Sequence, residues 1–256
     1  MICGLDPQFF ARPLAHRGLH TDKAGILENS RSAFAAAIEK GYGIELDLQL
    51  SADGQAMVFH DDTLDRMTSH QGPVRNHTAK NLERMALKQS DDCILPLVAL
   101  LQQVSGSVPL LIELKDQTGD LSSSNGDLER ATANALQHYQ GAVAVMSFNP
   151  FSVLEMRRQA PQIARGLTTE VFTKEEWPKI SKDKRLNLTN ISDFEKCEAS
   201  FISHNHEDLE SAPVRALKAK GVPILCWTIE TKAQQHAARQ LADNFTFEGF
   251  QPATSS

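Results

Sequence analysis

Apolar and polar residues alternate along the stretch GIELDLQL, residues 43 to 50. In an extended chain its isoleucine and three leucines fall on one face, whereas Glu45 and Asp47 fall on the other. This alternation predicts a β-strand whose apolar face is buried. A half-exposed strand would turn both acids to water, so the pattern leaves open whether they face solvent or a group that needs negative charge.

Short apolar stretches of this kind recur along the chain and alternate with helical patterns. Strands are predicted at PLAHR (13–17), GIELDLQL (43–50), QAMVFH (55–60), PLLIELK (109–115), AVAVMSF (142–148), ARGLTT (164–169), ASFISHN (199–205), VPILCWT (222–228) and NFTFEGF (244–250). Helices are predicted over residues 30–40, 127–139, 150–159 and 211–220. In the first of these helices, Ser30 is a suitable N-cap and Gly41 a suitable end.

Alternating strands and helices predict an α/β fold in which crossover helices join parallel strands. About eight such units in about 250 residues match the size of a TIM (β/α)₈ barrel, with a doubly wound sheet as the alternative. We expect one domain over residues 1–256, with a small insertion at about 61–105 lying over one end of the barrel. The stretch 119–126 predicts a loop, and 171–197 has no clear pattern.

A barrel gives the acidic face of residues 43–50 a specific meaning, because active sites of such barrels lie at the C-terminal ends of the strands. Glu45 and Asp47 then point into the barrel, and Glu113 in PLLIELK lies on a neighbouring strand at a similar height, with Lys115 just beyond it. Buried like charges raise one another's pKa unless a cation compensates them. Oxygen ligands favour Mg²⁺ or Ca²⁺, so we expect one such ion here; pairing with Arg or Lys is the alternative.

Histidines at two predicted strand ends supply candidate acid–base groups. His16, followed by Arg17, ends the first strand, and His60 ends QAMVFH. His204 and His206 have alternating spacing but no further ligands in reach, so we expect no metal there. Carboxylates, cations and two histidines suit an anionic phosphodiester: one histidine would activate the attacking oxygen and the other would protonate the leaving alkoxide.

Composition narrows the classes of protein and of partner. With 41% hydrophobic and 23% charged residues the chain is an ordinary globular sequence. Its net charge of −6, with scattered acids, predicts no nucleic-acid surface. No apolar run approaches the roughly 20 residues that cross a bilayer, and the N-terminus lacks secretory-signal features. Four solitary cysteines, Cys3, Cys93, Cys197 and Cys226, fit a reducing compartment, so we expect a cytoplasmic protein without stable membrane insertion.

The combination of stretches LAHRG, ENS and AIEKGYGIELDLQLSADGQAMVFHDDTLDRMT strongly resembles the glycerophosphodiester phosphodiesterases. LLIELK, SFNPFSVLEMRRQAP and VPILCWTI continue the resemblance in family order, through most of residues 13–229. It implies a TIM barrel of the phospholipase C-like phosphodiesterase type, with a small insertion after the second strand. It also implies hydrolysis of a small glycerophosphodiester to an alcohol and sn-glycerol 3-phosphate, in glycerol and lipid metabolism.

The resemblance also implies a role for individual positions. These are a metal site at Glu45, Asp47 and Glu113, an acid–base pair at His16 and His60, phosphate contacts at Arg17 and Lys115, support from Glu28 and Asn29, and a pocket wall at Trp227. Phe148 lines the same pocket or packs in the core. The chain departs from the family pattern in its ending, ADNFTFEGFQP, which lacks the usual aspartate-proline close, and in residues 171–197, which have no counterpart.

Two other functions remain as alternatives. A related phospholipase D-like activity on lysolipids would need an exposed apolar entry, and the insertion sequence PVRNHTAKNLERMALKQS offers no clear apolar lip. A catalytically silent phosphoester-binding barrel would have lost a histidine or a metal-binding acid, and neither is lost here.

Overall fold

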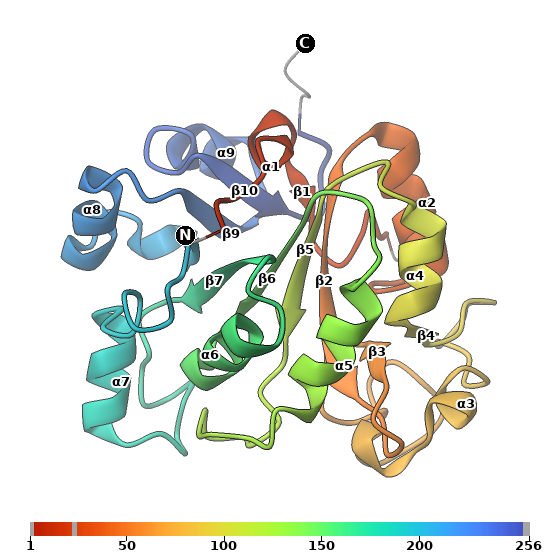
Figure 1. Cartoon of the computed structure of the whole chain (residues 1–256). Coiled ribbons are helices and arrows are strands. Elements are labelled where there is room, and N and C mark those ends of the chain that lie inside the picture. Colours follow the sequence, from red (N-terminus) through yellow and green to blue (C-terminus); the bar gives the residue numbers. More distant parts are fainter. Residues whose placement is uncertain (1–2, 22–24, 253–256) are drawn as a thin grey trace.

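Eight parallel strands close into a barrel in the computed structural model, which describes residues 3–21 and 25–252 (Figure 1). The barrel strands are β1 (Leu14–Ala15), β2 (Gly43–Leu50), β5 (Leu110–Leu114), β6 (Val143–Ser147), β7 (Ala164–Thr169), β8 (Phe201–Asn205), β9 (Ile224–Ile229) and β10 (Asn244–Phe247). Strand β1 closes the barrel, because Leu14 lies opposite both Gly43 of β2 and Thr246 of β10. The predicted (β/α)₈ barrel is therefore confirmed over the doubly wound sheet.

Helices surround the barrel in Figure 1. They are α1 (Gln8–Ala11), α2 (Arg31–Lys40), α3 (Ala79–Leu82), α4 (Leu97–Val104), α5 (Asp127–Leu136), α6 (Pro150–Gln159), α7 (Lys182–Thr189), α8 (Ala212–Ala219) and α9 (Lys232–Ala238), with short 3₁₀ turns η2 (Val74–Asn76) and η3 (His206–Asp208). The predicted ends of α2 are confirmed. Ser30 Oγ accepts a hydrogen bond from the Ala33 amide, and Gly41 ends the helix with a φ of 68°.

Both faces of the barrel strands are buried, but in different surroundings. Ile44 and Leu46 of β2 pack outward, in the same apolar cluster as Phe34 of α2. A second apolar cluster includes inward-facing residues such as Leu111 and Phe201 and is closed by Phe9 of α1. This apolar filling explains why polar residues at the same inward face must lie at the other, C-terminal end of the barrel.

The predicted strand at 55–60 is real but lies outside the barrel. Strand β3 (Ala56–Val58) runs antiparallel to β2, and β4 (Leu95–Pro96) runs antiparallel to β3. Only residues 51–55 separate β2 from β3, which allows a hairpin but is too short for a parallel crossover. This excursion lies at the end of the barrel to which β5 points (Figure 1).

The residues between β2 and β5 divide into two groups by their packing. Side chains from Met57 to Ile94 form a separate apolar cluster. By contrast, α4 packs with the barrel helices through residues such as Leu100. The insertion at about 61–105 remains our prediction for the domain organisation, and α4 is the part of it that covers the barrel.

A second excursion, residues 171–197, follows β7 and contains α7. Phe172, Ile180 and Leu188 form a small apolar cluster with Leu121, and Phe148 and Trp177 pack against it. Because Leu121 follows β5 and Phe148 follows β6, this excursion covers the C-terminal ends of neighbouring strands.

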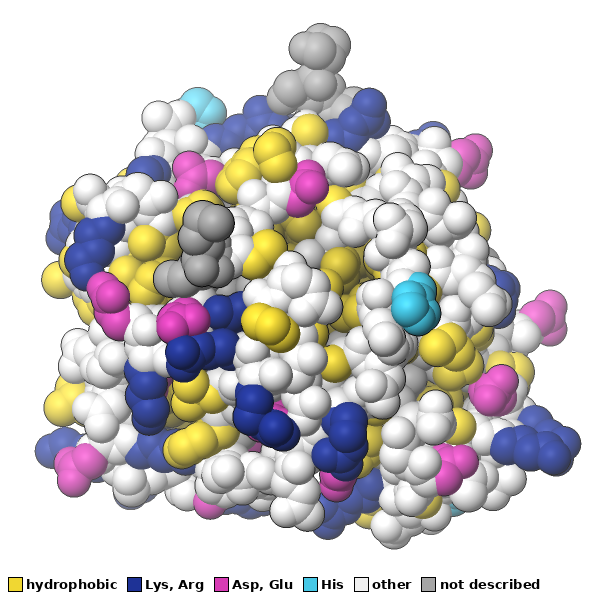
Figure 2. All heavy atoms as spheres, in the orientation of Figure 1, with side chains coloured by type: hydrophobic (Ala, Val, Ile, Leu, Met, Phe, Trp, Pro, Cys, Tyr) yellow, Lys and Arg dark blue, Asp and Glu magenta, His cyan; other side chains and the backbone are white. Residues whose placement is uncertain are grey.

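The surface carries charges of both signs. Acidic and basic side chains are interspersed over the face seen in Figure 2. Within residues 3–21 and 25–252, no helix has the length and apolar character required to cross a membrane.

Candidate active site

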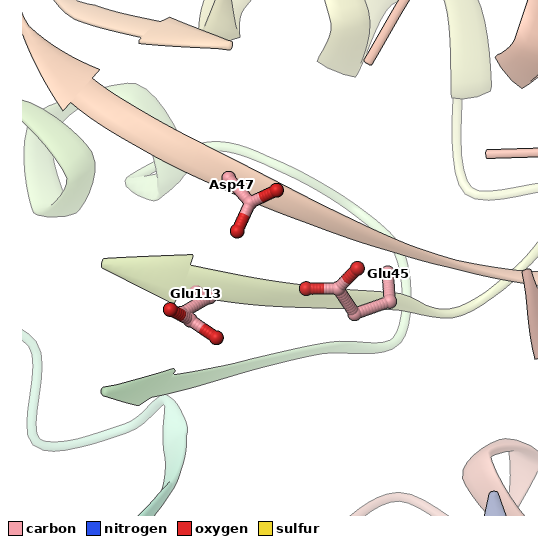
Figure 3. Close-up of side chains that lie close together, drawn as sticks. All are labelled: Glu45, Asp47 and Glu113. Carbon is pink, nitrogen blue, oxygen red and sulfur yellow. The ribbon is translucent and has the colours of Figure 1, made fainter. Parts of the chain in front are cut away.

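Three carboxylates meet at the C-terminal mouth of the barrel (Figure 3). Strand pairing places Asp47 of β2 opposite Glu113 of β5, and Glu45 opposite Leu111. One oxygen of each acid lies within 4.8 Å of the others, and the residues are only 2%, 2% and 6% exposed for Glu45, Asp47 and Glu113. Such a buried, oxygen-only set of donors is chemically suited to a hard divalent cation.

Two cationic side chains lie beside this cluster. Lys115 Nζ is 2.7 Å from Glu113 Oε1 and 3.5 Å from Asp47 Oδ1. Arg17 Nε is 3.4 Å from Asp47 Oδ2, and the Arg17 amide donates to Glu45 Oε2 at 3.1 Å. The alternative of pairing with Arg and Lys is therefore present in part. Glu45, however, has no ion pair with a cationic side chain among the described residues.

The pKa shifts of the cluster follow from this uneven compensation. Burial, with the nearby charges of Asp47 and Glu113, raises the pKa of Glu45 well above its usual value. Burial also disfavours the charged form of Asp47, but Lys115 and Arg17 outweigh it and hold the pKa of Asp47 below its usual value. Three buried acids against two cations leave excess negative charge, so the residues present fit a divalent cation.

The loop after β1 is shaped around Asp47. Arg17 and Asn29 both have left-handed backbones, with φ of 53° and 54°. Such a conformation is strained in residues other than glycine and is often found at functional sites. Asn29 Nδ2 donates to Asp47 Oδ2 at 2.9 Å, and the Asp47 amide donates back to Asn29 Oδ1 at 3.3 Å. Glu28 accepts from Arg17 Nη1 at 2.8 Å, so the expected supporting residues do contact the site.

Each of the two candidate histidines is held by a carboxylate. His16 Nδ1 lies 2.6 Å from Glu248 Oε2, and His60 Nδ1 lies 2.7 Å from Asp61 Oδ1. Both rings are close enough to Asp47 for their positive charge to lower its pKa. An ionised carboxylate only accepts hydrogen bonds, so each Nδ1 is the donor and each Nε2 is left for proton transfer.

His60 reaches the mouth by an unexpected route. It does not end a barrel strand but follows β3, whose extension returns along β2, with the Phe59 amide donating to Asp47 O at 3.0 Å. Arg66 helps to fix the position of the loop that carries His60, because its side chain connects this loop to the loop that carries Glu28. Its Nε donates to Asp61 Oδ2 at 2.7 Å and its Nη1 to Glu28 Oε2 at 2.8 Å.

An aromatic wall stands beside the acids. The ring centroid of Phe148 lies 5.6 Å from that of Trp227 and 5.4 Å from that of Trp177. A cavity of about 480 Å³ opens here, lined by residues that include Glu113, Lys115, Phe148 and Trp177. Phe148 therefore lies at a cavity next to the acid cluster, and Trp227 packs against it.

His204 and His206 take no part in this site. His204 is buried, its Nδ1 lies 2.8 Å from Thr169 Oγ1, and burial lowers its pKa. His206 lies in η3. Within the described ranges, the acid cluster is the one group of three side chains able to share an ion.

Sequence reasoning missed four contacts of the site. Asp61 stood beside His60 in the sequence and could have been found there. Arg66 lies only five residues after Asp61, but its second partner, Glu28, lies 38 residues earlier. Glu248 carries no local signal, because it lies 232 residues from His16. Trp177 belongs to the stretch 171–197, whose pattern predicted no element.

Fold and site together define a (β/α)₈-barrel enzyme with an acidic, metal-competent mouth flanked by two carboxylate-held histidines. The chain matches the glycerophosphoryl diester phosphodiesterase family over residues 16–243 and belongs to that family. The resemblance seen in the sequence is thereby confirmed, and the protein is an enzyme of the phosphoric diester hydrolase class.

Individual relatives agree with this assignment. A glycerophosphodiester phosphodiesterase of Caldanaerobacter subterraneus subsp. tengcongensis is 26% identical over 227 residues, which cover 86% of each chain. Among solved structures, a phosphodiesterase of Oleispira antarctica in complex with the product sn-glycerol-3-phosphate has a TM-score of 0.75 at 22% identity, covering 93% of this chain and 92% of its own. A glycerophosphodiester phosphodiesterase of Agrobacterium tumefaciens has a TM-score of 0.69 at 22% identity, covering 93% and 96%.

Proposed function

We propose that this protein hydrolyses water-soluble glycerophosphodiesters to an alcohol and sn-glycerol 3-phosphate in a reaction that requires a divalent cation. One observation carries the proposal: three buried carboxylates and two carboxylate-held histidines converge on one barrel mouth. Family membership gives the reaction class, and the product bound to the Oleispira antarctica relative has the expected chemistry.

The cation would be held by Glu45, Asp47 and Glu113, and we propose Mg²⁺ or Ca²⁺. Their oxygen-only donor set and the excess negative charge of the cluster support this choice. When bound, such a cation supplies charge stabilisation for the phosphoryl oxygens.

The chain's own cations would orient the substrate. Arg17 and Lys115 lie at the edge of the acid cluster with side chains 18% exposed, so both can reach a phosphate without leaving the site. Glu28 and Asn29 support them, since Glu28 holds the Arg17 guanidinium and Asn29 holds Asp47. Phe148 and Trp227 would form the pocket wall.

His16 and His60 would move the protons of the reaction. One imidazole accepts the proton of the attacking oxygen, and the other donates a proton to the departing alkoxide, which is a poor leaving group without it. Their Nδ1 atoms are engaged by carboxylates, so Nε2 is the nitrogen available for these transfers.

We also propose that the chain functions as one domain with its insertion at about 61–105, in the cytoplasm, on a small molecule rather than on nucleic acid. All four cysteines are free thiols, which supports a reducing compartment. The net charge of −6 and the mixture of acidic and basic side chains on the face seen in Figure 2 support the absence of a nucleic-acid partner.

A metal-titrated assay tests the proposal. Protein freed of metal by chelation is supplied with Mg²⁺ or Ca²⁺ and offered glycerophosphocholine, glycerophosphoethanolamine, glycerophosphoglycerol and lysophosphatidylcholine. We expect metal-dependent release of sn-glycerol 3-phosphate from the water-soluble diesters. Glu45→Ala and Asp47→Ala should abolish it while leaving the circular dichroism spectrum unchanged, whereas the exposed Glu230→Gln serves as control.

Two outcomes would overturn the proposal. Activity confined to lysophosphatidylcholine would assign the protein to the lysolipid-specific alternative. No product from any substrate with either cation would favour the silent phosphoester-binding barrel.

A further inference from the structure

Glu248 lies in the part of the sequence that departs most clearly from the family pattern, the ending ADNFTFEGFQP. It follows β10, whose last residue, Phe247, pairs with Ala15 of β1. The His16 amide donates to Phe247 O at 2.9 Å, and the Glu248 amide donates to Ile229 O at 3.1 Å. Closure of the barrel therefore fixes the backbones of His16 and Glu248 side by side.

The Glu248 carboxylate faces imidazole rings. Its Oε2 is 2.6 Å from His16 Nδ1 and 3.6 Å from His20 Nε2. The hydrogen bond from His16 and the nearby His20 ring lower the pKa of Glu248, so it is ionised at neutral pH. No Arg or Lys side chain forms an ion pair with it within residues 3–21 and 25–252, so its charge is not shared with a stronger cation.

We propose that Glu248 is the positioning residue of His16, a role that rests on the proposed function. Its carboxylate holds the proton on Nδ1, turns the ring so that Nε2 faces the barrel mouth, and stabilises the ring when it is protonated. Glu248 is not among the acids of the metal cluster, so it acts through His16.

Other charged groups near His16 and Glu248 also influence any measurement of activity against pH. His20 faces the same carboxylate, Arg17 follows His16 in the chain, and Asp47 on β2 feels the charge of His16. The experiment must therefore compare variants that change Glu248 alone.

Glu248→Gln and Glu248→Asp test the inference, with Glu230→Gln as the matched control. Glu230 follows β9 as Glu248 follows β10, but its side chain is exposed and makes no hydrogen bond or ion pair among the described residues. The glutamine amide can donate a hydrogen bond to His16 Nδ1. It then favours the tautomer with its proton on Nε2, which cannot accept a proton at that nitrogen. We expect kcat on a glycerophosphodiester to fall roughly 10- to 10³-fold with KM changed less than about twofold. Aspartate should restore part of the loss, and the control should match the wild type.

Two readouts separate positioning from a merely structural effect. The pH profile of kcat/KM should differ between Glu248→Gln and the wild type, because the carboxylate beside His16 is gone, and it should be unchanged in Glu230→Gln. In NMR spectra of ¹⁵N-histidine-labelled protein, the strongly hydrogen-bonded Nδ1 proton of His16, assigned with His16→Gln, should vanish in the same variant.

The results also distinguish this inference from the proposed function. An inactive wild type would refute the function, while the NMR signal would still report whether Glu248 fixes the tautomer of His16. An active wild type whose Glu248→Gln variant keeps kcat, pH profile and Nδ1 proton would overturn the role of Glu248. If Glu248→Gln does not fold, Glu248→Asp carries the same comparison, and wild-type behaviour on all three measures would again overturn it.

Discussion

Glu45 and Asp47 sit two positions apart on β2, yet their pKa values shift in opposite directions. Asp47 has Lys115 and Arg17 beside it, whereas Glu45 receives one amide hydrogen bond from Arg17 and feels the like charge of its neighbours. The difference comes from side-chain partners rather than from burial, because the two acids are equally buried. Glu45 is therefore the acid whose charge a bound cation would relieve most.

The leaving group provides a test, at the level of one residue, of the hypothesis that His60 is the acid and His16 the base. His60→Ala should reduce hydrolysis of glycerophosphocholine by roughly 10²- to 10⁴-fold, because the departing alkoxide needs a proton. It should affect bis(p-nitrophenyl) phosphate much less, because p-nitrophenolate leaves without an acid. Steady-state rates on both substrates, with His16→Ala for comparison, provide the measurement.

Equal losses on the two substrates would argue against His60 as the acid. If His16→Ala instead shows the selective loss, the acid is His16 and the two roles are exchanged.

At the scale of elements, β2 belongs to two structures at once. Its residues Ile44 to Leu48 pair with β5 inside the barrel, and Leu48 to Leu50 also pair with β3 outside it. This double pairing is what brings His60 back to the acid that precedes it by 13 positions. A conventional βα unit would have placed its strand-end histidine on the next barrel strand instead.

The N-cap of helix α2, Ser30, provides a prediction about stability. It directly follows Asn29, which contacts Asp47 of the acid cluster. Ser30 is fully buried and its hydroxyl accepts from the Ala33 amide at 3.1 Å. Ser30→Ala should lower the free energy of unfolding by about 1 kcal/mol, since that buried amide loses its partner. Urea denaturation would measure the loss.

The matched control is Ser181→Ala, at the cap of α7. Ser181 is exposed, and its hydrogen bond from the Lys184 amide is long at 3.4 Å, so water can replace it. If Ser181→Ala lowered the free energy of unfolding as much as Ser30→Ala does, burial of the cap would contribute nothing to stability.

At the scale of the whole molecule, closure of the barrel decides which residues meet. Strand β1 joins β10 to β2, and so brings the loop of His16 next to Glu248 and Glu45. The same closure brings Glu45, Asp47 and Glu113 together at the barrel mouth with fewer cations than acids. The stability of the fold should therefore depend on whether these acids are charged.

The dependence of stability on pH follows from Glu45. Its folded-state pKa is raised above the usual value of 4.5, so the unfolded chain loses this proton first as pH rises. Stability therefore falls as pH rises from about 4.5 toward the folded-state pKa, and it stays lower above that. Without metal, Glu45→Gln should be more stable than the wild type at pH 8, and this difference should disappear below about pH 4.5.

Thermal unfolding with and without chelator measures this effect. Saturating Mg²⁺ or Ca²⁺ should raise the Tm of the wild type, because only the folded state binds the ion tightly, and should raise that of Glu45→Gln far less. The pKa of Asp47 is lowered from its usual value of 3.8, so Asp47 changes the stability only at lower pH. It therefore does not affect the comparison between pH 4.5 and pH 8. A Glu45→Gln variant less stable than wild type at pH 8 without metal would contradict the prediction.

The amino-acid sequence by itself determined much of this protein. Period-two alternation in residues 43–50 and 109–115 predicted two strands with inward acids, and Asp47 does lie opposite Glu113. Ser30 and Gly41 marked both ends of α2. These features follow from local periodicity and capping, which depend on neighbours a few residues apart.

Only the tertiary structure decided the rest. Whether residues 56–58 joined the barrel or folded back as β3 depended on hydrogen-bond partners, not on the strand's own pattern. Trp177 and Glu248 contact the site from distant parts of the chain, and Arg66 connects the loop after His60 to Glu28, 38 residues earlier. No local pattern marks such contacts. The pKa shifts of Glu45 and Asp47 likewise depend on charges that closure of the barrel brings within a few ångströms. Periodicity shows which face of a strand is buried; the group that face meets is set by the path of the whole chain.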